Sequence, residues 1–418
     1  MIRLASAGFI FAIALAVAAS PASAVKCRDE ITNHTVLTAD LTCKCYYGAS
    51  DNLIVVGPAT LDLNGHTVSC KLKYYSSTCI SIRGKGATVK NGIVSGCYSG
   101  VGGEFRGALI KDIIAERNGY YGIHVNGNNN KLQNVTAKHT RVVTYDNCNE
   151  EFGCLEYVIG TGIFLSGNNN RLLNARATDN ANWDIDVDGN NNEVRDSFVA
   201  RSGEGVLLYG KDNTVISNTV EDSKTDGISI YNGIGNVIRN NTFRRCGGNG
   251  VNIEEGSNSI VADNKLYSTG SASIYVSGRN SNIRLTGNRI TKSSGDGIVL
   301  DYATNAVVAS NVIVNSAGNG IVLGPSAARC RVKNNTVRKC GMVGLRIRGA
   351  DGSNFTNNMI SFCKTGISAG VGSNRNRLIN NRASNNTLFD LSDLSANCGS
   401  NVWKGNTGKG NIACTQEK

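Results

Sequence analysis

Residues 227–253, GISIYNGIGNVIRNNTFRRCGGNGVNI, contain one full period of a repeat that runs through most of the chain. A run of glycine, an apolar residue, any residue and a second apolar residue opens this stretch at 227–230 and returns at 250–253. The first apolar residue of each such run, here called the anchor, recurs at Ile123, Ile163, Ile185, Val206, Ile228, Val251, Ile274, Ile298, Ile321, Leu345 and Ile367. Successive anchors are 21–24 residues apart, except for one gap of 40 residues. A fixed period of this length predicts a solenoid.

A polar residue follows each anchor by 11–14 residues: Asn134, Asn174, Asp196, Asn218, Asn241, Asn264, Asn288, Asn311, Asn335, Asn358 and Asn381. Asparagine tolerates left-handed backbone, so it suits a sharp corner, and stacked corners allow amide side chains to bond from coil to coil. A period of about 22–24 residues is too short for a helix crossover. The sequence therefore predicts an all-β fold, a single-stranded right-handed parallel β-helix with an asparagine ladder and capped ends.

The first residues, MIRLASAGFIFAIALAVAASPASA, have the charge, apolar run and small-residue cleavage pattern of a signal peptide, residues 1–24. The apolar run is too short to span a membrane, and no later run is long enough, so we expect no membrane span. Fourteen cysteines in an exported chain predict disulfides. Candidate pairs are Cys27–Cys43, Cys148–Cys154 and Cys398–Cys414, and the pairing of the other cysteines stays open. We expect a secreted or periplasmic monomer.

The formal net charge is +11, and it falls to +10 when Arg3 is removed with the signal peptide. A basic exported protein favours an anionic partner, and an acidic polysaccharide or an anionic cell surface fits that compartment better than nucleic acid does. The alternative is a basic surface without a specific partner.

Several segments carry a family resemblance: LTADLTC (37–43), LDLNGHTV (61–68), the repeats themselves and NVWKGNTGKGNIAC (401–414). They resemble exported bacterial right-handed parallel β-helix proteins of the pectin-lyase-like superfamily, with repeats of the carbohydrate-binding and sugar-hydrolase type. The resemblance covers essentially the whole mature chain. With it we expect an N-terminal cap over 25–58, the β-helix over 59–395 and a disulfide-linked C-terminal cap over 396–418, because open solenoid ends would pair with other chains.

The 40-residue gap between the anchors Ile123 and Ile163 predicts an insertion of roughly 18 residues around 139–160. This insertion ends just before an anchor, so it should rise on the rim beside the outward face of the strands. Insertions on one face of a repeat protein commonly line the binding face.

The residue between the two apolar positions of each run should point outward, and so should the residue after them. The resemblance implies that a polysaccharide lies on this strand face. The expected substrate-binding residues are Phe164, Asp188, Tyr209, Tyr231, Asn252, Glu254 and Tyr275.

Tyr121 and His124 are candidates for a proton-transfer pair, because a lyase or epimerase needs a base near neutral pH. Their run YGIH resembles the Tyr–His active-site segment of mannuronan epimerases, although the intervening Asp-Pro of that pattern is missing. The alternative is a surface histidine stacked on Phe164.

The segment WDIDVDGNNNEV (183–194) places Asp184, Asp186 and Asp188 at alternate positions. Crowded carboxylates raise one another's pKa, so Asp184 and Asp186 are candidates for acid/base catalysis. The three carboxylates together are also candidate Ca²⁺ ligands, since hard cations prefer several oxygen ligands. The plain alternative is a solvated face.

Three functions remain after this reading. The first is a lyase or C5-epimerase acting on an acidic, uronate-containing polysaccharide, and the second is a non-catalytic glycan- or cell-surface-binding protein. A third, metal delivery like that of periplasmic β-helix proteins tied to copper enzymes, is disfavoured because three methionines and four histidines are few for copper. A polygalacturonase is excluded, since its two matching segments, 224–230 and 344–349, lie about five coils apart.

Overall fold

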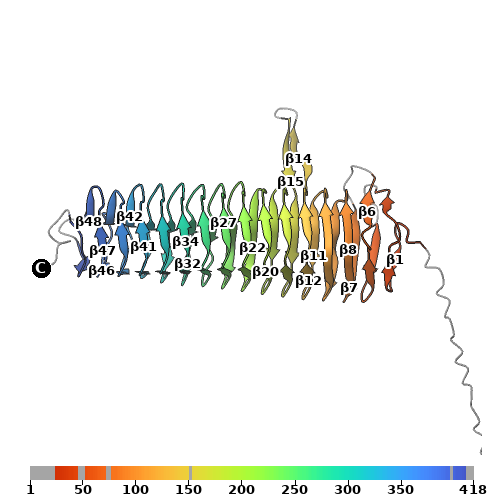
Figure 1. Cartoon of the computed structure of the whole chain (residues 1–418), viewed down its shortest axis with the longest axis horizontal. Coiled ribbons are helices and arrows are strands. Elements are labelled where there is room, and N and C mark those ends of the chain that lie inside the picture. The colour runs from red at the N-terminus through yellow and green to blue at the C-terminus, as the bar shows by residue number, and fades with distance from the viewer. Residues whose placement is uncertain (1–23, 46–51, 72–76, 150–152, 396–398, 411–418) are drawn as a thin grey trace, which may run out of the picture.

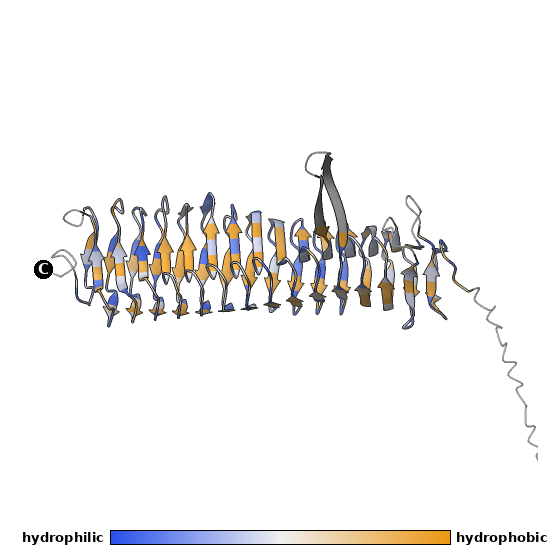
Figure 2. Ribbon diagram, turned by 90° about the horizontal axis from the view of Figure 1, so that it is seen from above, coloured by the Kyte–Doolittle hydropathy of each residue, from blue (hydrophilic) through white to orange (hydrophobic). Residues whose placement is uncertain are grey.

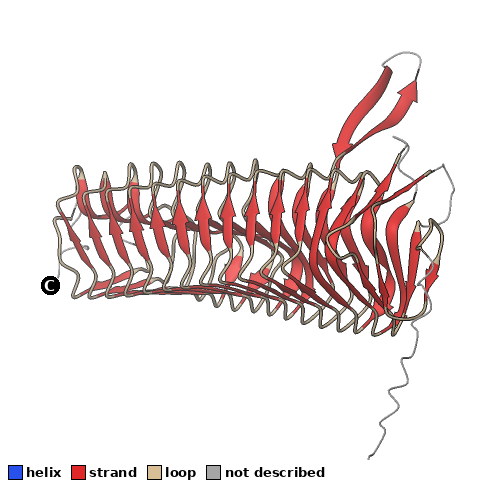
Figure 3. Cartoon of the chain, turned by 45° about the vertical axis from the view of Figure 1, so that its right-hand side comes forward, coloured by secondary structure: helices blue, strands red, loops and turns tan. Residues whose placement is uncertain are grey.

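The computed structural model describes residues 24–45, 52–71, 77–149, 153–395 and 399–410, with the backbone alone for 143–149 and 153–157. It is a right-handed parallel β-helix whose coils stack along one long axis (Figures 1 and 3). Almost all of the expected signal peptide, residues 1–24, lies outside the described residues. The described part of the chain contains no helix that is long and apolar enough to cross a membrane.

Each coil contributes one strand to each of three parallel ladders. The first ladder, here called sheet A, has 16 strands. Its strands are β1 (Glu30–Ile31), β4 (Leu53–Val56), β7 (Thr78–Lys85), β9 (Ser99–Arg106), β11 (Tyr121–Asn126), β16 (Thr161–Ser166), β19 (Trp183–Asp188), β22 (Glu204–Lys211), β25 (Ile228–Ile234), β28 (Val251–Glu254), β31 (Ile274–Ser277), β35 (Ile298–Leu300), β39 (Ile321–Leu323), β42 (Val343–Ile347), β45 (Thr365–Ala369) and β48 (Phe389–Asp393). β1 and β4 lie within 25–58, so the segment expected as a cap already contributes strands to this sheet.

The second ladder, B1, follows sheet A in each coil. It contains β2 (Thr35–Val36), β5 (Thr60–Asp62), β8 (Thr88–Ser95), β10 (Leu109–Glu116), β12 (Lys131–Gln133), β17 (Arg171–Leu173), β20 (Glu193–Arg195), β23 (Thr214–Ile216), β26 (Val237–Arg239), β29 (Ile260–Ala262), β33 (Arg284–Thr286), β37 (Val307–Ala309), β40 (Arg331–Lys333), β43 (Asn354–Thr356), β46 (Arg377–Ile379) and β49 (Val402–Lys404).

The third ladder, B2, closes each coil. The long strands β8 and β10 belong to both B1 and B2. The other strands of B2 are β3 (Leu41–Cys43), β6 (Thr67–Cys70), β13 (Thr136–Lys138), β18 (Arg176–Thr178), β21 (Phe198–Ala200), β24 (Thr219–Glu221), β27 (Thr242–Arg244), β30 (Lys265–Tyr267), β34 (Arg289–Thr291), β38 (Val312–Val314), β41 (Thr336–Arg338), β44 (Met359–Ser361) and β47 (Arg382–Ser384). A small separate pairing joins β32 (Asn280–Ser281) to β36 (Ala303–Thr304).

The anchors form the core, as the repeat predicts. Every anchor from Ile123 to Ile367 is fully buried, and each pairs in register with the anchor of the next coil. Apolar residues recur along the stacked strands in Figure 2. Burial of one such aliphatic side chain contributes about 1.5–3 kcal/mol, so stacking the coils supplies most of the driving force for the fold.

The asparagine ladder runs inside the corner between B1 and B2. From Asn218 to Asn381 each side-chain amide nitrogen donates to the amide oxygen one coil further on, over 2.9–3.1 Å, and Asn406 is the last acceptor. Asn134, Asn174 and Asp196, which the spacing assigned to this ladder, instead occupy the preceding outer position with φ of 52–54°. The inward residues of those three coils are Val135, Ala175 and Ser197, so the ladder begins only where the corner supplies a buried amide.

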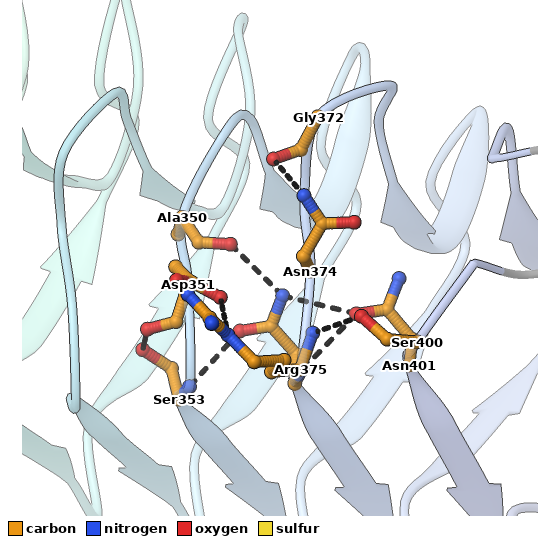
Figure 4. Close-up of polar contacts among 9 residues, drawn as sticks. Ala350, Asp351, Ser353, Gly372, Asn374, Arg375, Ser400 and Asn401 are labelled. Carbon is orange, nitrogen blue, oxygen red and sulfur yellow. Dashed lines mark hydrogen bonds and ion pairs between the residues drawn. The ribbon is translucent and has the colours of Figure 1, made fainter.

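A second set of buried amides lines the corner between sheet A and B1, and the sequence analysis did not find it. Asn130 donates its side-chain amide to Asn170 Oδ1 over 3.0 Å, and Asn192 and Asn213 continue the stack. The repeated segment GNNN, at 127–130, 167–170 and 189–192, was its signal in the sequence. Near the C-terminal end Asn401 lies at the same corner (Figure 4).

The 40-residue gap between anchors contains an antiparallel hairpin of β14 (Val142–Asn149) and β15 (Gly153–Ile159). The hairpin projects from the solenoid between β13 and β16 (Figures 1 and 3). The expected Cys148–Cys154 bond concerns side chains outside the described part of the structure.

Four disulfides occur among the described residues: Cys27–Cys43, Cys45–Cys70, Cys79–Cys97 and Cys340–Cys363. Only the first was expected from the sequence, and the expected Cys398–Cys414 pair lies outside the described residues. Disulfides form and persist in oxidising compartments, so the chain is an exported protein.

Candidate functional site

The outward surface of sheet A has the register that the repeat predicts. The residues between the apolar positions align as His124, Phe164, Asp186, Leu207, Ser229, Asn252 and Tyr275. The next outward residues align as Asn126, Ser166, Asp188, Tyr209, Tyr231, Glu254 and Ser277. We call this surface the sheet A face. Adjacent strands are ~4.8 Å apart, so His124 and Asp186 are separated by ~10 Å across β16.

Aromatic rings gather at the N-terminal part of the sheet A face. The Tyr121 ring stacks on His124 at 4.7 Å between centroids and on Phe164 at 5.4 Å. Tyr120 contacts Tyr121 edge-on at 4.6 Å and stacks on Tyr98 at 5.4 Å. The histidine–phenylalanine contact weighed as the structural alternative is therefore present, at 5.3 Å, and it coexists with the Tyr121–His124 pair.

Burial sets the protonation of this pair. It lowers the pKa of His124, so the imidazole is neutral at neutral pH and can accept a proton. Burial, with smaller contributions from Tyr120, Tyr98 and Asp186, raises the pKa of Tyr121, so the phenol keeps its proton. A proton acceptor and a proton donor thus lie side by side.

Asp186 lies two strands from His124 and is largely buried. Burial, followed by repulsion from Asp188 and Glu204, raises the pKa of Asp186 to about 7. A carboxyl group with this pKa exchanges protons near neutral pH, which is the property expected of an acid/base group.

Glu204 is a neighbour that the sequence analysis missed. It pairs in register with Trp183, whose indole N–H donates to Glu204 Oε2 over 3.2 Å. Burial raises the pKa of Glu204, and repulsion from Asp226 adds to the increase. The signal was an acid directly before the glycine of an anchor run, as in EGVLL (204–208) and DGISI (226–230).

Asp226 extends the set by one more coil. Its Oδ1 accepts from the Asn249 N–H at 2.5 Å, and its Oδ2 accepts from the Ser229 hydroxyl at 3.5 Å. Burial raises its pKa as well. We call Asp186, Glu204 and Asp226 the acid row. Two buried oxygens of the acid row, Asp186 Oδ1 and Glu204 Oε1, have no hydrogen-bond partner, and neither has Asn252 Oδ1 beside it.

Asp184 does not share this surface, contrary to the expectation that three aspartates face outward together. Its side chain is 0% exposed and lies inside the coil, where Oδ1 accepts from Asn180 Nδ2 over 2.7 Å. The position corresponds to Gly162 one coil earlier, whose added Cβ would lie 2.5 Å from the same Asn180 nitrogen. The chain turns inward there, so period-two alternation fails at the strand start, and burial raises the pKa of Asp184.

The remaining expected residues follow along the same face. Tyr209 and Tyr231 stack at 5.9 Å between ring centroids, and Tyr209 is exposed. Glu254 is exposed at the end of β28, whereas Asn252 is only 9% exposed. Leu207 and Ser229 point outward but are covered by their neighbours.

A pocket of about 380 Å³ lies further toward the C-terminus on the sheet A face. The Tyr275 hydroxyl donates to Asp301 Oδ2 over 3.3 Å at this pocket, and Arg348 lies across it. Ala272, Val299 and Val322 form an apolar floor against which Tyr275 packs. We call it the distal pocket. Only Tyr275 was expected from the sequence: Asp301 and Arg348 continue the outward position after the second apolar residue, but the expected residues ended at Tyr275.

Two family models match parts of the chain. The right-handed β-helix region matches residues 154–290 and 183–328. The chain is a right-handed parallel β-helix repeat protein. A second model, the periplasmic copper-binding protein NosD, matches residues 280–416. Among curated proteins, none matches the chain in sequence.

Three solved structures of low sequence identity align with this chain, and the first of them, with a TM-score above 0.5, supports the fold. The catalytic unit of a thermostable GH87 α-1,3-glucanase from Streptomyces thermodiastaticus strain HF3-3 aligns with a TM-score of 0.52 and 11% identity, over 86% of this chain and 65% of that chain. A mutant of the periplasmic alginate epimerase AlgG gives 0.48 and 14%, over 77% of each chain. The A-module of mannuronan C-5 epimerase AlgE6 from Azotobacter vinelandii gives 0.46 and 12%, over 87% of this chain and 91% of that chain. At sequence identities this low, a structural similarity indicates a shared fold and nothing further.

The segment that matches the copper-binding model does not assemble soft-metal ligands in its described residues. It contains no histidine, its Cys340 and Cys363 are joined in a disulfide, and Cys330 is buried alone. Its two methionines, Met342 and Met359, are exposed on separate elements, before β42 and at the start of β44. The sulfur atoms of Cys45, Cys70 and Cys97 do converge within 4.8 Å, but they lie outside that segment and belong to two disulfides. Copper prefers free thiolate, thioether or imidazole ligands, so these residues do not fit a copper site.

Proposed function

We propose that this chain is an exported polysaccharide-processing enzyme that acts on uronate chains as a lyase or C5-epimerase, with the polymer bound along the sheet A face. The observation that carries the proposal is the juxtaposition on β11–β19 of a neutral imidazole, a protonated phenol and a carboxyl group with a pKa of about 7. Such groups, poised near the working pH, are what removal of a proton beside a sugar carboxylate requires.

In this proposal His124 accepts the proton at C5 of the uronate. For a lyase, the electron pair forms the C4–C5 double bond, the C4–O bond breaks and Tyr121 protonates the departing oxygen. For an epimerase, Tyr121 returns a proton to C5 from the opposite side. The two rings, stacked at 4.7 Å, offer an acceptor and a donor within reach of one sugar unit.

The acid row must be compatible with an anionic substrate. Protonated Asp186 can donate a hydrogen bond to the uronate carboxylate, which stabilises the charge that develops during proton removal. The unpartnered oxygens of Asp186 and Asn252 lie three strands apart, ~14 Å along the face, so they do not converge on one Ca²⁺. Arg348 in the distal pocket can pair with another carboxylate of the same polymer.

The test is incubation of the purified mature protein with polymannuronate, polyguluronate, polygalacturonate and a neutral α-glucan, with Ca²⁺ or with a chelator. Ultraviolet absorbance of the unsaturated uronate reports a lyase, and NMR of the polymer reports epimerisation. We expect product from one uronate polymer and its loss in Tyr121→Phe. The absence of product from all three uronates would overturn the proposal, and release of reducing ends from the glucan would assign the acid row to hydrolysis.

Non-catalytic glycan binding is the second candidate, and the Tyr209–Tyr231 stack with the apolar floor beside Tyr275 favours it, because aromatic rings stack on sugars without any chemistry. Polymer binding that survives replacement of His124 and Asp186 in a protein without product formation would support it. Loss of binding in Tyr231→Ala would place the polymer on the sheet A face.

A further inference from the structure

The charge of this chain is divided unequally along the solenoid. Residues 279–410 contain 17 lysines and arginines against 5 aspartates and glutamates, a net charge of +12. Residues 25–278 contain 24 basic and 26 acidic residues, a net charge of −2. The basic character of the protein therefore resides in the C-terminal third.

Nine cations of this third stack on the outward side of ladders B1 and B2, away from the sheet A face, whereas Arg346 and Arg348 lie on the sheet A face. Arg284, Arg331 and Arg377 occupy the same first position of β33, β40 and β46, and they recur on every second coil, ~10 Å apart. We call the following exposed residues the cationic face: Arg284, Arg289, Lys292, Arg331, Lys333, Arg338, Lys339, Arg377 and Arg382.

Cations at the same ladder positions of earlier coils have acidic partners. Arg171, at the first position of B1, pairs with Glu193 of the next coil at 2.8 Å, and Glu193 also accepts from Arg195 at 2.6 Å. On B2, Arg245 pairs with Asp222 at 2.6 Å. Charge pairing between adjacent coils is thus an ordinary feature of these ladders.

The cationic face lacks such pairing. Over the described residues of 279–410 one ion pair occurs, between Arg375 and Asp351 (Figure 4), and Arg375 lies at a corner outside this face. Arg338 lies over the Phe362 ring at 5.8 Å, and no member of the cationic face is in an ion pair there. Exposed like charges ~10 Å apart repel one another at low salt, where the Debye length exceeds this distance, so the arrangement costs stability there and favours an anionic ligand.

We propose that the cationic face binds a linear acidic polysaccharide that lies along the solenoid axis, separately from the sheet A face. A rod of regularly spaced carboxylates complements cations that repeat every second coil. Single-stranded nucleic acid is a less suitable ligand, because base stacking needs a row of aromatic platforms and the cationic face itself is formed by lysines and arginines.

This inference does not rest on the proposed catalytic chemistry, and its test separates the two. Binding of polygalacturonate and alginate would be measured as a function of salt for the protein and for Arg284→Gln/Arg331→Gln/Arg377→Gln. We expect at least a tenfold loss of affinity and a fall of about three in the slope of log affinity against log salt concentration. The matched control is Arg171→Gln/Arg195→Gln/Arg245→Gln, which removes three paired cations and should keep its affinity.

His124→Ala should retain full binding at the cationic face, whether or not the protein forms a product. A second triple variant, Lys333→Gln/Arg338→Gln/Lys339→Gln, guards against a local folding defect and should also weaken binding. Equal affinity of the three triple variants would overturn the proposal. So would binding to single-stranded DNA or to phosphatidylglycerol vesicles that is tighter than binding to both polyuronates.

Discussion

The coils around β11–β28 and those around β33–β47 share one backbone and differ in what they present to solvent. Both stack aliphatic anchors inside and pair strands in the same parallel register. The first region holds aromatic rings, the acid row and paired cations, whereas the second holds unpaired cations. The inward residues therefore determine the fold, and the outward residues are free to give each stretch of the solenoid its own surface chemistry.

The largest effect should be on the catalytic rate, when the same outward position is changed in the first region and in the second. His124→Ala removes the proton acceptor on β11, and we expect activity to fall by about 10²–10⁴-fold. The measurement is the initial rate of product formation on the uronate polymer that the protein accepts. Ser368→Ala, at the aligned position on β45, is the matched control and should leave the rate unchanged. Equal rates for the two variants would remove His124 from the mechanism.

The asparagine ladder is a second difference, between the first coils of the first region and the rest of the solenoid: it is continuous from Asn218 onward and absent from the coils of Val135 and Ala175. Asn311 donates to Leu285 O and Asn335 Oδ1 and accepts from the backbone and side chain of Asn288. Asn311→Ala leaves these buried groups unpaired, so we expect a loss of about 3 kcal/mol in the free energy of unfolding.

The measurement for Asn311→Ala is the shift of the urea unfolding midpoint. Asn354→Ala, which removes an exposed amide from the outward side of β43, is the matched control and should change stability by less than about 0.5 kcal/mol. A shift as small as that of the control would mean that the ladder contributes little to stability.

The raised pKa of Asp186 makes the stability of the protein depend on pH between about 4 and 7, which the arginines and lysines of the cationic face cannot do. Its pKa is raised from 3.8 to about 7 in the folded protein, so between these values the folded state binds more protons than the unfolded state. Stability therefore falls as pH rises from about 4 to about 7, and Asp186→Asn removes this loss. We expect the variant to be more stable than the parent by about 2–4 kcal/mol at pH 8 and similar at pH 4.

Thermal unfolding of the parent and of Asp186→Asn across this pH range is the measurement. Asp196→Asn serves as the control, because Asp196 is exposed at the corner between B1 and B2 and is not among the groups that raise the pKa of Asp186. Parallel stability curves for the parent and Asp186→Asn would show that Asp186 titrates like an ordinary surface aspartate.

The repeat predicted the core and the register because anchors such as Ile185 and Val206 must be buried for any coil to stack. That register also placed His124, Phe164 and Asp186 in one line. Asp184 was misplaced because the chain turns inward at the strand start, where alternation no longer applies. Glu204 was missed because it stands two residues before its anchor, outside the aligned positions, and Arg348 was missed because the expected outward residues ended at Tyr275.

The smallest effect should come from the cations themselves, and it should have opposite signs in the two regions. Arg284→Gln/Arg331→Gln/Arg377→Gln relieves repulsion and should raise the free energy of unfolding by about 0.5 kcal/mol at low salt, whereas Arg171→Gln/Arg195→Gln/Arg245→Gln breaks ion pairs and should lower it by about 0.5 kcal/mol. Both differences should vanish near 1 M salt, where the Debye length is about 3 Å. Urea unfolding at low and high salt measures both. If both variants change the free energy of unfolding in the same direction, the arginines of the cationic face do not measurably repel one another. Their charge would then be neutralised within the fold and not by a bound polyanion.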